Sequence, residues 1–153
     1  MNGDKPMRFS KWEKWKERHN IPHLKEPGVY VIAISNKNIS GKKFKLIKEI
    51  IYFGMTNSNG GLKNRLQSFD NGIKGGNGHG GAQRFYRKFK SKPPFPKLFV
   101  SISPRKREAK SNIPTVWRIE GEILKQECDC IANYAEKYRE LPMFNDHKKS
   151  PKK

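Results

Sequence analysis

Apolar positions in the first half of the chain form two short runs that are typical of β-strands. Residues 29–35 and 45–53 are rich in valine, isoleucine and aromatic side chains, and turn-forming polar residues fill segment 36–43 between them. That connection is too short to hold a crossover helix, so the two strands are expected to pair antiparallel. Tyr30 and Tyr52 would then lie in neighbouring strands of one hairpin.

The apolar spacing then changes to that of a helix. Three apolar residues recur at positions i, i+4 and i+7 and predict a short helix that ends at the turn-forming residues 70–72. They are Leu62, Leu66 and Phe69. Arg65 shares their face, and an inward arginine is costly unless an anionic group accompanies it. The next segment, 71–81, holds six glycines without the order of a phosphate-binding loop, and predicts a mobile loop that could order around a ligand.

Downstream, residues 82–90 predict a second helix and residues 97–102 a third strand. A last helix begins near residue 114 and extends past residue 131, with one break before residue 139 left open.

The last helix carries a carboxylate inside its apolar stripe. At about 100° per residue, its main apolar side chains fall within about 60° of Glu120. They are Val116, Trp117, Ile123, Leu124 and Ile131. Glu122 points away and is expected to be solvated, whereas Glu127 falls on the same side as Glu120 and remains a second candidate carboxylate.

The first residues also predict a helix. Ser10 followed by Glu13 fits a capping box for a helix through about residue 19. Trp12 and Trp15 would share one face of it and pack on the core. A basic aromatic helix that contacts DNA or a membrane is the alternative.

Length and charge bound the class of protein. The 153 residues suit one domain, which we divide into a helical extension at 1–27, a main domain at 28–145 and a basic tail at 146–153. Lysine and arginine number 33 against 14 acidic residues, which gives a formal charge of +19. A polyanion would offset that self-repulsion, so nucleic acid is the leading partner.

Membranes and zinc are disfavoured by the sequence. The longest apolar run is far too short to cross a bilayer, and the first residues lack the apolar region of a signal peptide. Cys128 and Cys130 form an isolated pair, and the four histidines supply no zinc-finger spacing. We therefore expect a soluble, cytoplasmic protein without disulfides or structural zinc.

Two tyrosines on a hairpin, an inward arginine and an inward glutamate together suit phosphodiester hydrolysis. A carboxylate can hold a divalent metal ion, an arginine can neutralise charge on a phosphate, and a phenol can orient or deprotonate water.

The same residues resemble the GIY-YIG nuclease family, whose five landmarks occur here in order. They are GVY at 28–30, YFG at 52–54, LKNRL at 62–66, EGEIL at 120–124 and PMFN at 142–145. This resemblance implies an α+β fold, with a small three-stranded antiparallel sheet flanked by helices. It also implies cleavage of DNA with one Mg²⁺ or Mn²⁺ ion.

The resemblance further implies a role for each matching residue. Tyr30 would be the general base or would orient the attacking water, and Tyr52 would hydrogen-bond within the same site. Arg65 would bind the scissile phosphate, Glu120 would hold the metal ion, and Asn145 would buttress the site. The other assigned residues are His79 as the histidine that follows the arginine in many members, and Lys63, Arg84, Arg87 and Lys88 as DNA contacts.

Within that family, the short chain favours a standalone nuclease of the restriction or phage-encoded type, acting on double-stranded DNA in a bacterial cell or phage-infected host. A homodimer is left open, because one site cuts one strand at a time. The rival hypothesis is a non-catalytic DNA- or RNA-binding protein on the same scaffold, for which the charge and the aromatic residues would suffice. It gives no reason for Glu120 in an apolar stripe.

Overall fold

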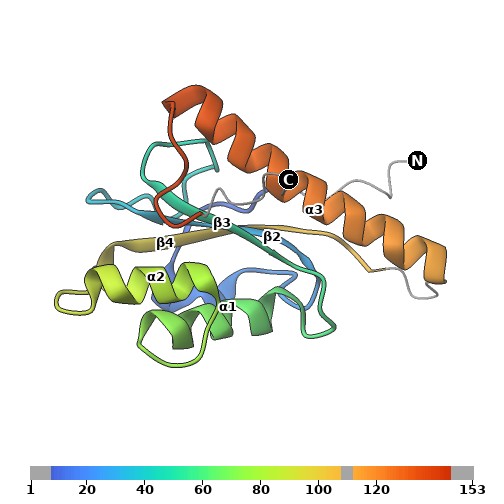
Figure 1. The fold of residues 1–153 in the computed structure, drawn as a ribbon, viewed down its shortest axis with the longest axis horizontal. Helices are drawn as coiled ribbons and strands as arrows, with labels where there is room; N and C mark the ends of the chain where they lie inside the picture. The colour runs from blue at the N-terminus through green and yellow to red at the C-terminus, as the bar shows by residue number, and fades with distance from the viewer. Residues whose placement is uncertain (1–7, 108–111, 146–153) are drawn as a thin grey trace, which may run out of the picture.

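The computed structural model describes residues 8–107 and 112–145. Within them, an antiparallel four-stranded sheet has the order β1-β4-β2-β3, with α1 and α2 on one face and α3 on the other (Figure 1). The strands are β1 (Glu13–Lys14), β2 (Gly28–Ile34), β3 (Ile50–Thr56) and β4 (Leu98–Pro104). The helices are η2 (Trp15–Asn20), α1 (Gly61–Ile73), α2 (Gly80–Phe89), η3 (Phe95–Lys97) and α3 (Ile113–Tyr138). The α+β class is confirmed, but the sheet has four strands rather than three.

The fourth strand comes from the segment that was predicted to be a helix. Instead of capping a helix, the Ser10 hydroxyl accepts a hydrogen bond from the Ile102 backbone N–H at 3.0 Å, which ties this segment to β4. The helix prediction is therefore wrong, and only the short 3₁₀ helix η2 follows β1. Trp12 and Trp15 are both buried, as expected, but they enter the two opposite core layers rather than sharing one face. Residues three apart in an extended chain point to opposite sides.

The predicted antiparallel hairpin of β2 and β3 is confirmed. In its register Tyr30 lies opposite Gly54 and Ile32 opposite Tyr52. However, β3 begins at Ile50 rather than at residue 45, so the connection is longer than predicted.

The helix α1 continues through the residues that were expected to end it. Asp70 is buried there, and its carboxylate accepts hydrogen bonds from Trp15 Nε1 and Lys74 Nζ, both at 2.8 Å. Arg18 lies 3.6 Å from the same carboxylate. A residue type that favours turns is thus retained inside a helix, because its side chain anchors the N-terminal segment to α1.

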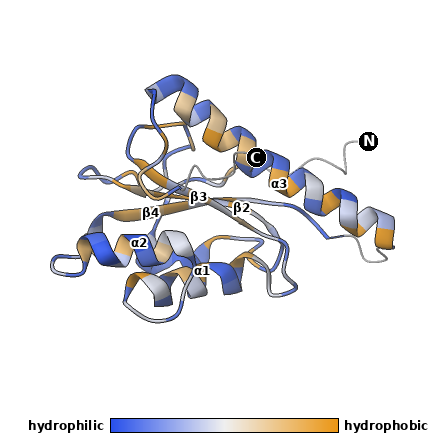
Figure 2. Cartoon of the chain, in the orientation of Figure 1, coloured by the Kyte–Doolittle hydropathy of each residue, from blue (hydrophilic) through white to orange (hydrophobic). Residues whose placement is uncertain are grey.

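The helix α3 is unbroken, and its first half extends past the sheet (Figure 1). Figure 2 shows some hydrophobic residues on these first turns. Two large side chains of this part of α3 are mostly exposed, Ile113 at 74% and Trp117 at 70%. The residues of α3 that are buried are Ile123, Glu127 and Tyr134. Glu120 is only half-buried, so the prediction that it lies at the centre of a buried stripe is wrong.

Among the described residues, no helix is both long enough and apolar enough to span a membrane. The predicted tail at 146–153 and the first seven residues lie outside the described part of the chain.

Candidate functional site

Two tyrosines from neighbouring strands face the α1–α2 side of the sheet. The ring centroids of Tyr30 and Tyr52 are 6.0 Å apart, and Phe69 of α1 contacts both rings at centroid distances of 6.2 and 5.6 Å. Tyr30 is fully buried, whereas Tyr52 is partly exposed. The predicted pairing of the two tyrosines in one site is therefore present in the structure.

Each tyrosine ring lies over a glycine. A Cβ atom added at Gly54 would come within 2.4 Å of the Tyr30 hydroxyl, and one added at Gly81 would come within 2.5 Å of Tyr52 Cε1. Both distances are far shorter than a normal carbon contact of about 3.5–4.0 Å. The glycine of YFG is thus needed by the tyrosine of GVY on the adjacent strand.

Arg65 and His79 lie beside the tyrosines. Burial raises the pKa of both tyrosines and the charge of Arg65 partly opposes that rise, whereas burial and the charge of Arg65 both lower the pKa of His79. The guanidinium is therefore near all three groups. His79 precedes α2, and Gly81 of that helix lies under the Tyr52 ring. Four predicted residues from four separate segments are therefore brought together.

Three enclosed polar atoms of this cluster have no hydrogen-bond partner within the described residues. They are the Tyr30 hydroxyl, Arg65 Nε and His79 Nε2. Arg65 and Tyr52 are close enough to the Tyr30 hydroxyl to affect its pKa, but neither meets it with the alignment of a hydrogen bond. Buried polar atoms are normally paired, so such a concentration is typical of a site that binds a ligand or ordered water.

Burial controls the protonation of these groups. Burial, followed by the charge of Tyr52, raises the pKa of Tyr30, and the opposing charge of Arg65 does not compensate. Burial and the charge of Glu127 likewise raise the pKa of Tyr52. Burial and then the charge of Arg65 lower the pKa of His79. At neutral pH both phenols therefore keep their protons, while His79 is neutral and can accept one.

The carboxylate that reaches this cluster is Glu127 rather than Glu120. Glu127 is 8% exposed, and its charge raises the pKa of both tyrosines. Glu120 lies two turns earlier on the same side of α3, about 10 Å away along the helix axis. Residues seven positions apart fall on nearly the same side of a helix, so a helical wheel cannot tell which of the two is buried. That depends on where α3 packs against the sheet.

Asn145 lies at the free edge of β3. Its side chain accepts a hydrogen bond from the Phe53 N–H and donates one to the Phe53 carbonyl, both at 2.9 Å. The Phe144 N–H donates to the Ile51 carbonyl at 2.8 Å. Asn145 thus extends the sheet next to Tyr52, as a buttressing residue would.

The cations assigned to DNA binding differ in their surroundings. Arg84 is half-buried and donates two hydrogen bonds to the Phe144 carbonyl, at 2.7 and 3.2 Å, while its charge partly offsets the burial that raises the pKa of Tyr52. It therefore anchors the C-terminal segment and adds positive charge to the site. Lys63, Arg87 and Lys88 are exposed.

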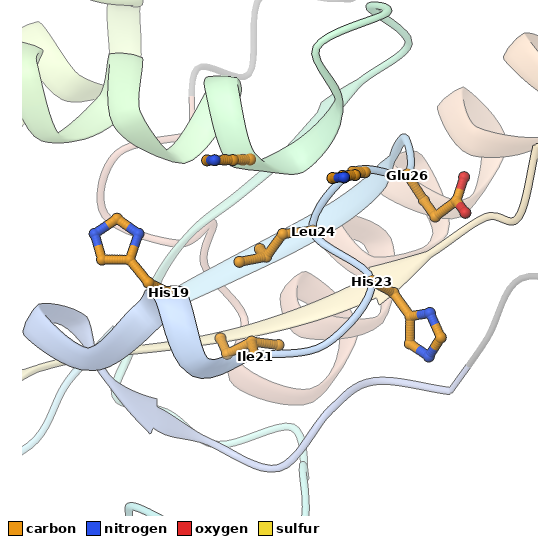
Figure 3. Close-up of a pocket in the computed structure, with 7 residues that line it drawn as sticks. His19, Ile21, His23, Leu24 and Glu26 are labelled. Carbon is orange, nitrogen blue, oxygen red and sulfur yellow. The ribbon is translucent and has the colours of Figure 1, made fainter.

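A hollow of about 810 Å³ adjoins Lys63 and was not predicted from the sequence. Its other lining residues are His19, Ile21, His23, Leu24, Lys25 and Glu26. In Figure 3, His19 and His23 point to opposite sides of the hollow, with Leu24 and Ile21 between them. No spacing motif marks it, because its walls come from η2, from the irregular segment that follows η2, and from α1.

A magnesium-type ion fits this site only in one mode. The described residues contain no group of three or more histidine, cysteine, aspartate or glutamate side chains placed to hold a metal ion. Mg²⁺ is often held by one or two carboxylates, together with substrate phosphate oxygens and water. A single buried carboxylate, Glu127, suits that mode and does not suit a zinc-type cage.

The chain matches no protein-family model, no curated protein and no solved structure. Its function is therefore inferred from the residues of the site.

Proposed function

We propose that this chain is a metal-dependent endonuclease of the GIY-YIG type that hydrolyses phosphodiester bonds of double-stranded DNA. The observation that carries the proposal is the convergence of Tyr30, Tyr52, Arg65, His79 and Glu127 around several enclosed polar atoms without partners. These groups supply a cation for the phosphate, a carboxylate for a metal ion and a group that can accept a proton.

The protonation states assign the roles. Arg65 binds the scissile phosphate, since its enclosed Nε has no partner among the described residues. Tyr30 keeps its proton and orients the attacking water, because burial opposes formation of its phenolate. His79, which its lowered pKa leaves neutral, accepts the proton of that water. Tyr52 and Asn145 hold the geometry of the site.

Glu127 would hold the Mg²⁺ or Mn²⁺ ion, with Glu120 as the alternative carboxylate. When bound, such an ion stabilises charge on the phosphate and lowers the pKa of a bound water molecule. The protein's own contribution is a buried carboxylate whose charge acts on both tyrosines.

The proposed partner follows from charge. The net charge of +19 and the exposed cations Lys63, Arg87 and Lys88 support binding to DNA phosphates. We propose an enzyme of the restriction or phage-encoded type, acting in the cytoplasm of a bacterial or phage-infected cell, with a homodimer as one way to cut both strands.

The test is cleavage of mixed plasmid and single-stranded DNA with magnesium or with EDTA, read on a gel. Glu127→Gln should abolish cleavage and leave DNA affinity nearly unchanged, because the carboxylate serves the metal ion. Glu120→Gln is the matched control, since it makes the same change on the same side of α3, and it should cleave normally. The reverse result would assign the metal ion to Glu120. Binding without cleavage by the native protein would instead support the non-catalytic nucleic-acid-binding protein.

The pH dependence tests the proton acceptor. Because the pKa of His79 is lowered, cleavage should persist as the pH falls below the usual histidine value of about 6.5, and should fail only at the lower value. His79→Gln should remove most of the rate together with that acidic limb. Tyr30→Phe should lose more rate than Tyr52→Phe, since Tyr30 contacts the water. An unchanged acidic limb in His79→Gln would exclude His79 as the base.

A further inference from the structure

A second hollow, of about 540 Å³, combines basic and aromatic side chains. Its lining residues are Arg8, Phe9, Lys11, Lys43 and Phe44. The rings of Phe9 and Phe44 are stacked, with centroids 4.3 Å apart and an interplanar angle of 21°. We call these five residues the basic aromatic hollow.

Backbone pairing holds the two aromatic segments together. The Ser10 N–H donates to the Ile102 carbonyl of β4 at 2.7 Å. On the other side, the Trp12 N–H donates to the Lys42 carbonyl at 3.0 Å, and the Gly41 N–H donates to the Trp12 carbonyl at 2.8 Å. The segment before β1 is thus fixed between β4 and the β2–β3 connection. This pairing fixes Phe44 against Phe9 before any ligand arrives.

The charge of the basic aromatic hollow has one sign. Arg8, Lys11 and Lys43 are exposed, and none of the lining residues is acidic. Within the part of the chain that the structure describes, none of these three cations forms an ion pair. Phe9 and Phe44 are only half-buried, so part of the stacked pair faces solvent. The hollow therefore presents a flat apolar surface within a cationic rim.

The basic aromatic hollow is separate from the candidate active site. It adjoins the segment that leads into β1, whereas Tyr52 and Asn145 belong to β3 and its free edge. The strands β1 and β3 are the two opposite edges of the sheet. Its side chains are also distinct from those of the proposed nuclease chemistry.

We propose that the basic aromatic hollow binds single-stranded nucleic acid, with a base stacked on the Phe9–Phe44 pair and phosphates held by the three cations. Grooves that combine basic side chains with aromatic platforms bind single strands in this way. A duplex hides its base faces within its own stack, so it can use the cations but not the rings. An acidic peptide would need the cations but no flat aromatic surface. The proposal shares only the nucleic-acid partner with the proposed function and requires no cleavage.

The test measures binding of a labelled oligothymidylate of about 10 nucleotides, and of its duplex, by fluorescence anisotropy in EDTA. Phe44→Leu keeps an apolar side chain but removes the flat ring. It should weaken single-strand binding on the order of tenfold and leave duplex binding nearly unchanged. Equal effects on the two ligands, or no effect on either, would overturn the stacking role.

A charge-reversal pair tests the rim. Lys11→Glu with Lys43→Glu should weaken single-strand binding and reduce its salt slope by about 0.7 for each lost phosphate contact. Lys16→Glu with Lys37→Glu makes the same charge change at exposed lysines outside the hollow and should have a smaller effect. Equal losses of single-strand affinity in the two double variants would mean that the lysines act by general electrostatic attraction rather than as part of this site.

A gain of signal keeps the test independent of folding defects. Phe44→Trp retains an aromatic face, and its added fluorescence should be quenched by the single strand but not by the duplex. No quenching in this folded variant would overturn the proposal. Cleavage by the native protein could still be intact in that case, so the two hypotheses fail separately.

Discussion

Gly54→Ala is the most direct test of how the two strand motifs depend on each other. The new methyl carbon would lie 2.4 Å from both Cζ and the hydroxyl of Tyr30, and 2.7 Å from its Cε1. Normal contacts between such atoms are about 3.5–4.0 Å, so the ring must move by about 1 Å or more. Tyr30 is fully buried and packs against the rings of both Tyr52 and Phe69, which leaves little room. Overpacking of this kind lowers the free energy of unfolding by about 1–3 kcal/mol.

Gly121→Ala is the matched control. Apart from its chain neighbours and the backbone of its own helix, no atom of the described residues lies within 4 Å of a Cβ added at Gly121, in the interior of α3. Replacing an unhindered helical glycine by alanine should raise the free energy of unfolding by about 0.5–1 kcal/mol. The same chemical change is therefore expected to have opposite signs at the two positions.

Urea unfolding followed by circular dichroism measures both effects. Gly54→Ala should lower the midpoint and Gly121→Ala should raise it, with the denaturant slope unchanged. In addition, Gly54→Ala should reduce cleavage under conditions where both variants are folded, because the Tyr30 hydroxyl is displaced. An unchanged midpoint and unchanged cleavage for Gly54→Ala would show that the Tyr30 ring does not lie over this glycine.

Three further predictions concern stability. Burial alone would raise the pKa of Asp70, but the hydrogen bonds from Lys74 and Trp15 outweigh burial and lower the pKa. The ionised carboxylate therefore stabilises the fold at pH values above its unfolded pKa of about 3.9. That stability should be lost as the pH falls through the lower folded value, and urea midpoints at several pH values should show this loss for the native protein and not for Asp70→Asn. Asn145→Ala removes two hydrogen bonds to Phe53 and should lower the free energy of unfolding by about 1–3 kcal/mol, measured by the same assay. Arg139 ends α3 with φ of 61°, so Arg139→Gly should raise the melting temperature through a gain of up to about 1 kcal/mol; a decrease would contradict the strain argument.

The early segment shows where local signals are overruled. Ser10 and Glu13 have the spacing of a capping box, but in the fold this segment lies along one edge of β4 and pairs with it. The Ser10 backbone and hydroxyl bond to Ile102 of that strand, and β1 follows. A buried sheet edge offers hydrogen bonds and apolar contacts that a short isolated helix does not. A pattern in neighbouring residues cannot reveal that edge.

The elements whose pattern is local could be predicted from the amino-acid sequence alone. Period-two and helical spacing placed β2, α1, β4 and most of α3 within a few residues, and the two tyrosines were correctly assigned to adjacent strands. Spacing also put Arg65 on the inward side of α1. These features depend on which face of a single helix or strand is apolar, and the spacing of nearby residues is enough to identify that face.

Which distant groups share one site depends on long-range packing, which the sequence pattern does not reveal. Only the position at which α3 packs on the sheet buries Glu127 and lets its charge act on the tyrosines, while Glu120 stays half-buried. Likewise, only the packing of α2 under Tyr52 explains Gly81 and brings His79 near Arg65. Residues on the same side of a helix are equivalent in sequence, and they become different only when long-range packing buries one and leaves the other at the surface.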